Sequence, residues 1–273
     1  MGTDSPHLLS QLTHAQEAIE REQTILPTEI EVYREFGDRI RQLEPDREST
    51  NSDQRIETLS TKVGATRDSK AGANQSARTT IRTAYEETVM ATPSYDEEYG
   101  DTAVEALSSD FGRPLTNALL SDRPFTPLVK SRLLNKIDAA VEQRQDFYRN
   151  LDRESSALQT AHRELASIDE EIFAIESRPV FECPLSELEQ LVADTTELED
   201  QCDELLARRQ SGDLHSADTL FRSPHGISLA DYLYQPLDCH YPLLQSVADV
   251  SSRLSMIQTH LKTARQTQNE AVP

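Results

Sequence analysis

The sequence predicts an all-α protein, an elongated antiparallel coiled coil or helical bundle with a small central helical cap. Only 36% of its 273 residues are hydrophobic and none is tryptophan, which is little material for two globular cores. Apolar residues instead recur at spacings of three and four, and we find no strand pattern and no internal repeat. Narrow apolar seams between long helices need less interior than a globule, so this composition suits such a fold.

The first segment, residues 8–75, begins with a long amphipathic helix from about 8 to 44. Pro27 lies inside it and lacks an amide hydrogen, so we expect it to kink the helix or split it. The pattern is weakest between residues 46 and 76, where Gly64 and Gly72 lower the helix propensity. The apolar positions of the long helix are Leu8, Leu12, Ala15, Ile19, Leu26, Ile30, Tyr33, Ile40 and Leu43.

Residues 76–124 are expected to form the cap, with short helices at about 95–111 and 114–122. This segment contains "ETVMATPSYDEEYGDT", residues 87–102, in which aromatic and acidic side chains gather. Three tyrosines here are interpreted as packing residues at a helix junction. An enzyme or ligand-binding junction built from the same side chains is the weaker alternative. The three are Tyr85, Tyr95 and Tyr99.

The acidic run in this stretch is interpreted as the start of a helix. Pro93 cannot continue the preceding helix, and Ser94 followed by Glu97 is a capping-box pattern. The helix dipole favours acidic residues in the first turn. The alternative is a cation site, but oxygen ligands in dedicated loops usually alternate around a glycine turn, and the acidic residues of this run do not alternate in that way. Its ligands would be Asp96, Glu97, Glu98 and Asp101.

Residues 125–210 are expected to form a long antiparallel helical hairpin. No Gly or Pro interrupts the chain from Leu128 to Arg178, which predicts a helix of roughly fifty residues, about 75 Å long. The turn "SRPVFECP" then reverses the chain, and a second helix runs from Leu185 to about Arg209. Ser186 and Glu189 give a capping box near its start.

A heptad repeat can be assigned to the long helix. Its position d stays mostly apolar, whereas its position a becomes polar toward the end of the helix. With Leu134 and Tyr148 at position a, position d takes Ile137 and Leu151. The register slips by about three residues near Leu165 and Ile168, which favours an irregular antiparallel bundle over a uniform parallel dimer. The other a positions are Val141, Ser155, His162 and Asp169, and the other d positions are Arg144, Leu158, Leu165 and Ile172.

The last segment, residues 211–273, combines a loop with a helix that packs on the bundle. A short helix is expected at "SLADYLY", residues 228–234, and the final helix from about Tyr241.

The charge of the chain indicates a salt-rich habitat. The formal net charge is -21, and arginine outnumbers lysine 22 to 5. Such a charge destabilises a compact state by self-repulsion in dilute salt, whereas molar salt screens it within about 3 Å. We therefore expect a halophilic protein; an ordinary acidic mesophilic protein is the alternative.

The same features bear on partners and location. Arg208-Arg209 is the longest basic run, so the chain gives no signal for direct nucleic-acid binding. The longest stretch without charged residues has twelve residues, 5–16, too short to span a membrane. The start lacks the pattern of a signal peptide, and three cysteines fit a reducing compartment. We expect a cytoplasmic protein with a protein partner or self-association.

The sequence predicts no catalytic, cofactor-binding or metal-binding residues and no cofactor. A zinc site in the loop-rich region is the alternative, but adjacent Cys239 and His240 rarely both reach one tetrahedral ion. No Glu-x-x-His pair, as in di-iron bundles, and no nucleophile or phosphate-loop motif occurs. His162 and Cys202 are expected to be seam and core residues. The ligands of such a zinc site would be His215, His225, Cys239 and His240.

Three parts of the chain resemble an uncharacterised haloarchaeal family of helical, coiled-coil-rich proteins, the domain of unknown function seventy-two sixty. They are "YEETVMATPSYDEEYG", the long charged helix after it, and "DYLYQPLDCHYPLL". The resemblance covers nearly the whole chain. It implies fold and lineage, and it brings no assigned activity, cofactor or catalytic residue.

The leading functional hypothesis is a non-enzymatic helical scaffold that docks protein partners by helix-in-groove packing. A regulatory protein acting on the transcription machinery is the alternative, and an enzyme at the tyrosine junction is the weakest.

Overall fold

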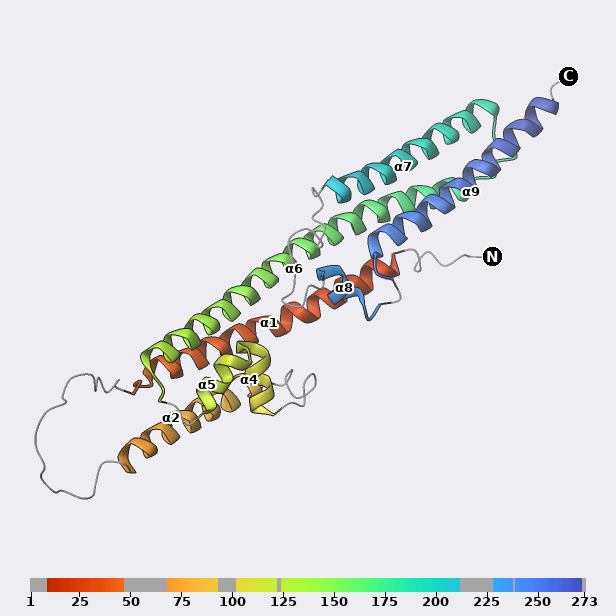
Figure 1. Cartoon of the computed structure of the whole chain (residues 1–273). Helices are drawn as coiled ribbons and strands as arrows, with labels where there is room; N and C mark the ends of the chain where they lie inside the picture. Colours follow the sequence, from red (N-terminus) through yellow and green to blue (C-terminus); the bar gives the residue numbers. More distant parts are fainter. Residues whose placement is uncertain are drawn as a thin grey trace, which may run out of the picture. The chain divides into compact units, whose positions relative to one another are not determined.

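The computed structural model describes the helical framework of the chain. It covers residues 9–46, 68–92, 102–121, 124–211, 228–237 and 239–271. The regular elements in these ranges are all helices (Figure 1), so the all-α prediction is confirmed. A coiled-coil arrangement of these helices stays a prediction.

The helices follow one another along the chain with these bounds: α1 Ser10–Gln42, α2 Asp68–Glu87, the 3-10 turn η2 Val89–Ala91, α4 Ala103–Phe111, α5 Arg113–Leu120, α6 Pro127–Glu176, α7 Leu185–Ser211, α8 Leu229–Tyr234 and α9 Pro242–Ala271.

These helices form two compact units, each with its own core. Unit 2 is the continuous stretch Thr24–Asp146, and unit 1 combines Met1–Gln23 with Phe147–Pro273. The first part of α1 and the second part of α6 therefore belong to unit 1, and the rest of both helices belongs to unit 2. The four-segment organisation expected from the sequence stays a prediction.

Helix α1 runs without a break through its proline. Pro27 lies inside the 33-residue helix. It removes one backbone hydrogen bond, but the buried side chains on both sides of it keep the segment packed. Of the two outcomes expected at Pro27, the split is therefore wrong, and the kink stays a prediction.

The long hairpin has the predicted helix ends. Helix α6 has 50 residues, and α7 begins after a turn at residues 177–184. Helix α2 runs through Gly72, where the sequence pattern is weak. The segment that precedes α2, with Gly64, lies outside the described residues.

The buried face of α6 differs from the expected heptad at position a. There, the residue that faces the core is the one directly before the expected residue. Leu133 and Phe147 are buried, whereas Tyr148 is 36% exposed. The predicted slip near Leu165 and Ile168 is also wrong, since both continue one repeat with spacings of three and four. The buried and half-buried positions of that repeat are Leu133, Ile137, Ala140, Arg144, Phe147, Leu151, Glu154, Leu158, Ala161, Leu165, Ile168, Ile172 and Ile175.

The first turns of α4 and α7 can be compared with the capping boxes expected from the sequence. Helix α4 begins at Ala103, where Thr102 and Glu105 form a capping box, and these hydrogen bonds from Thr102 lower the pKa of Glu105. The predicted start at Ser94, with Glu97, lies outside the described residues. Helix α7 begins at Leu185, with the carbonyl of Pro184 accepting its first bonds, so Ser186 is already inside the helix and is not its cap.

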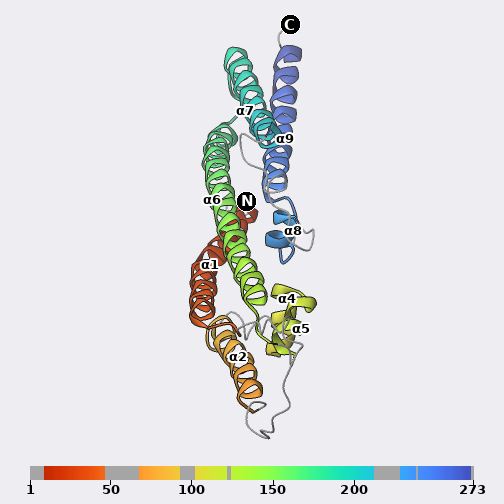
Figure 2. The ribbon, with the colours of Figure 1, turned by 60° about the vertical axis from the view of Figure 1, so that its left-hand side comes forward.

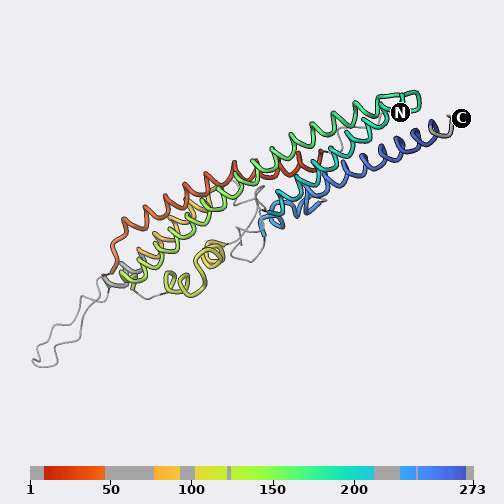
Figure 3. The backbone as a smooth tube through the Cα atoms, turned by 90° about the horizontal axis from the view of Figure 1, so that it is seen from above, coloured from red at the N-terminus to blue at the C-terminus, as the bar shows by residue number. Residues whose placement is uncertain are grey.

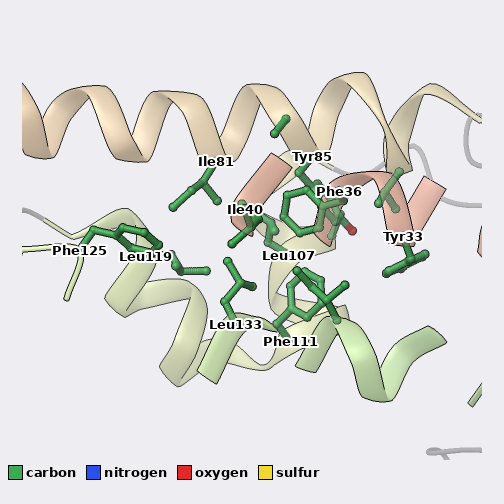
Figure 4. Packing of buried hydrophobic residues seen from close by; sticks show 14 residues of the cluster. Tyr33, Phe36, Ile40, Ile81, Tyr85, Leu107, Phe111, Leu119, Phe125 and Leu133 are labelled. Carbon is green, nitrogen blue, oxygen red and sulfur yellow. The ribbon is translucent and has the colours of Figure 1, made fainter. Parts of the chain in front are cut away.

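The core of unit 2 is an aromatic cluster shared by α1, α2, α4 and α6. Phe36 and Tyr85 meet edge to face with ring centroids 5.4 Å apart, and Phe111 stacks on Phe36 at 6.0 Å. Figure 4 shows these rings converging between the helices. Gly37 lets α1 approach α6, because a Cβ there would lie 3.2 Å from Ile137 Cγ2.

Unit 1 is built around α7, α9 and the second part of α6, which lie side by side (Figure 2). Helices α7 and α9 run antiparallel, and Gln258 of α9 donates to Glu199 of α7 at 2.9 Å. The turn between α6 and α7 lies next to the C-terminal end of α9 (Figure 3), where Gln268 donates to the carbonyl of Cys183. Helix α8 buries Leu229, Leu233 and Tyr234 in the same unit.

Candidate functional site

The tyrosine junction proposed from the sequence is only partly described. Tyr85 is fully buried in the unit 2 core, and its hydroxyl donates to Asp110 Oδ2 at 2.6 Å. Tyr33 donates to the same oxygen. Tyr95 and Tyr99 lie outside the described residues, as does the alternative cation site at Asp96, Glu97, Glu98 and Asp101. What the structure brings together is therefore Tyr33, Tyr85 and Asp110.

Arg144 extends this cluster on the other side of Tyr33. Its guanidinium lies 3.9 Å from the Tyr33 ring centroid and donates to Glu29 Oε2 at 2.9 Å. Burial, with the Asp110 carboxylate, raises the pKa of Tyr33 well above its usual value. Burial lowers the pKa of Arg144, but Tyr33 and Glu29 outweigh it and raise that pKa overall. These groups stabilise one another, and Tyr33 stays a neutral hydrogen-bond donor at neutral pH.

A second polar cluster lies in unit 1. Glu154, only 1% exposed, accepts two hydrogen bonds from Arg209, at 2.7 and 3.0 Å. The Tyr234 hydroxyl donates to the same carboxylate at 2.7 Å. A buried carboxylate with a bidentate arginine and a phenol has its hydrogen bonds satisfied, so this cluster joins α6, α7 and α8.

A shallow groove of about 390 Å³ lies on unit 2 between α1 and α6. Ile137 and Val141 form its apolar part, and both signs of charge line its edge. Arg41, one of these residues, is already bonded to Asp38 and Asp138 at 2.8 Å. The groove therefore has no uniform charge to select a ligand.

The alternative zinc site is only partly described, because two of its four ligands lie outside the described residues. In those ranges no three His, Cys, Asp or Glu side chains are grouped to hold an ion. Cys239 is half-buried and His240 exposed, while His215 and His225 lie outside the description. Cys202 is fully buried, as predicted, and burial raises the pKa of its thiol, which disfavours the reactive thiolate.

The end of the α6–α7 hairpin carries the feature that these clusters lack, namely apolar side chains left outside. Phe173 and Phe181 are each 61% exposed, and Leu185 is 39% exposed. Phe173 lies in the last turn of α6, Phe181 in the connecting turn, and Leu185 is the first residue of α7. We call these three residues the hairpin-end surface.

The connecting turn is held in place by its own contacts. Arg178 forms an ion pair with Glu187 at 2.7 Å across the turn. Cys183 is buried below it, and its carbonyl accepts from Gln268 of α9. Phe181 is therefore presented by a turn that is bonded on both sides, and its exposure does not come from a loose loop.

The hairpin-end surface was not predicted from the sequence, because it contains no catalytic or metal-binding motif. Phe173 directly follows Ile172, a seam position, so it cannot share the buried face of α6. Phe181 lies in a turn, where polar residues are usual. Large apolar residues that do not fit the helical repeat are the sequence feature that would have indicated this surface.

Residues 10–258 match the model of the family described as "Domain of unknown function (DUF7260)". The chain belongs to this family. The match spans nearly all the described helices, from α1 into α9, and so includes both polar clusters and the hairpin-end surface.

Comparisons with curated proteins and with solved structures found no match. In the ranges that the structure covers, no helix is long and apolar enough to cross a membrane.

Proposed function

We propose that this member of the DUF7260 family is a non-enzymatic helical scaffold that docks a protein partner at the hairpin-end surface. The observation that carries the proposal is the 61% exposure of both Phe173 and Phe181. Single exposed apolar residues are common on protein surfaces, but two phenylalanines within nine positions, one on each side of a helix end, support an interface at this site. Aromatic residues are enriched at such interfaces.

The proposal includes a cellular setting, the cytoplasm of a halophilic archaeon. It is supported by the net charge of -21 and by the preference for arginine over lysine. The seam of α6, with its spacings of three and four, supports the coiled-coil packing that a scaffold of long helices would use.

Retention of partners from the native cells tests the docking function. The tagged wild-type chain is compared with the double variant Phe173→Ser/Phe181→Ser and with the control Leu128→Ser. Leu128 is 59% exposed and lies on the unit 2 part of α6, so the control removes a similar apolar surface elsewhere.

A stoichiometric partner should stay bound to the wild type and to Leu128→Ser, and should be lost from the double variant. Circular dichroism and thermal unfolding establish that all three chains are folded. If the double variant retains the same partner as the wild type, or if none of the chains retains any, the docking proposal is wrong.

A further inference from the structure

We infer that the partner's contact segment is basic and amphipathic: apolar residues that cover the hairpin-end surface, flanked by lysine or arginine. This inference rests on the proposed docking function and names the chemical class of the partner. Its basis is the charge that surrounds the three apolar residues.

Each apolar residue of the surface has a carboxylate next to it. Glu170 precedes Phe173 by three positions and Glu189 follows Leu185 by four, spacings that place side chains on the same side of a helix. Glu182 is the direct neighbour of Phe181. All three carboxylates belong to exposed residues.

These carboxylates are not neutralised within the described residues. Residues 169–189 contain seven acidic residues and a single basic one, Arg178. Arg178 is paired with Glu187, and Arg253 of α9 is paired with Asp169 and Glu176. In the described part of the chain, no ion pair involves Glu170, Glu182 or Glu189. The three apolar residues are therefore accompanied by three carboxylates without an ion pair in the described part of the chain, which we call the acidic rim.

The carboxylates of this rim discriminate between partner segments that the apolar residues alone could bind equally well. A second copy docked by the same surface would bring its own Glu170, Glu182 and Glu189 against these carboxylates, and like charges at a contact oppose association. A neutral or acidic segment would leave them desolvated without partners. Lysine or arginine around an apolar stripe satisfies both parts of the surface.

Three fluorescent peptides, each about five helical turns long, test the inference on the full chain by anisotropy. The first places leucines on one face and lysines beside them, the second has glutamate in place of lysine, and the third has the first composition scrambled so that no apolar face forms. The first peptide should bind at least about tenfold more tightly than either of the others, because only it matches both charge and shape.

Variants separate this site from the general attraction of an acidic protein for cations. Glu170→Gln/Glu182→Gln/Glu189→Gln should weaken binding of the first peptide at least about fivefold. The control Glu17→Gln/Glu31→Gln/Glu142→Gln removes the same charge from other exposed positions and should leave the affinity within about twofold of the wild type, because distant exposed charges are screened. Phe173→Ser/Phe181→Ser should also weaken binding strongly.

The outcomes distinguish this inference from the docking function beneath it. If the glutamate peptide binds as well as the lysine peptide, and Phe173→Ser/Phe181→Ser abolishes both, docking stands and the basic partner is wrong. If both triple variants weaken binding equally, the peptide is attracted by the overall charge of the protein and not by the hairpin-end surface. The inference is then wrong. Sedimentation that shows the chain forming dimers through Phe173 and Phe181 would instead identify a second copy as the occupant and overturn it.

Discussion

At the residue scale, Glu154 shows how a charged side chain can occupy a seam position of a long helix. Its carboxylate is only 1% exposed, and its oxygens are bonded to Arg209 and Tyr234. The favourable geometry offsets the loss of hydration only while all three groups are present. Removing the acid takes the bidentate carboxylate away from the Arg209 guanidinium, whose side chain is only 15% exposed.

We predict that Glu154→Ala lowers the free energy of unfolding by about 3 kcal/mol, the effect of breaking a buried ion pair. The matched control is Glu164→Ala on the same helix, whose partner Arg208 and own side chain are about one-third exposed, and which should lose at most about 1 kcal/mol. Urea unfolding measures both variants. Equal losses would show that the burial of Glu154 has no energetic consequence.

Tyr33 makes stability depend on alkaline pH. Because its pKa is raised in the folded state, the unfolded chain releases the phenol proton first as the pH rises through about 10. Stability from this group is therefore complete below about pH 10 and is lost above it. Tyr33→Phe should flatten the fall in unfolding free energy between about pH 9 and 11, and the absorbance titration should lose one phenol that ionises above the usual pH range. An unchanged slope would contradict the assignment to Tyr33.

At the element scale, the helices of the hairpin were predictable from sequence, but the side chains on their buried faces were only partly so. The long run without Gly or Pro set the length of α6, and Pro184 stands directly before α7. The residues that face the core were harder to predict, since Phe147 and Tyr148 are adjacent and both are aromatic. Glu154 then hid the other side of the repeat, because its partner Arg209 is distant in sequence.

The candidate surface was less predictable than the helices. Exposure of Phe173 and Phe181 depends on which face of α6 packs inward and on the contacts of the turn with α9. Neither is encoded in local spacing alone. The tyrosine pair on Asp110 likewise joins α1, α2 and α4 through contacts at long separation in sequence.

The close approach of α1 and α6 in unit 2 gives a prediction for these elements. Gly37→Leu should destabilise the chain by about 2 kcal/mol, because its Cβ would lie only 3.2 Å from Ile137 Cγ2 and the rest of the side chain must displace Ile137. Glu31→Leu at an exposed position of the same helix should stay within about 0.5 kcal/mol of the wild type. Thermal unfolding measures both, and a neutral Gly37→Leu would show that the helices can separate freely.

At the scale of the whole molecule, the net charge of -21 acts on every folded region at once. Salt should therefore stabilise the protein: we expect the unfolding temperature to rise steadily between about 0.1 and 2 M potassium chloride as repulsion is screened. The same measurement in sucrose, which stabilises by exclusion without screening, serves as the control. A rise in sucrose with none in potassium chloride would remove the support that charge gives to a halophilic setting.

The division of the chain into units also bears on its synthesis. Unit 1 is made from both ends of the sequence, and Gln16 near the start donates to Ser155 at 2.7 Å while Glu22 accepts from Tyr232. On a ribosome that works at about 5–20 residues per second, residues 10–23 emerge many seconds before their partners exist. Unit 2, being continuous, can assemble meanwhile. The opening half of α1 thus waits through translation with Leu12, Ala15 and Ile19 uncovered, an interval in which a chaperone would have its best access to this chain.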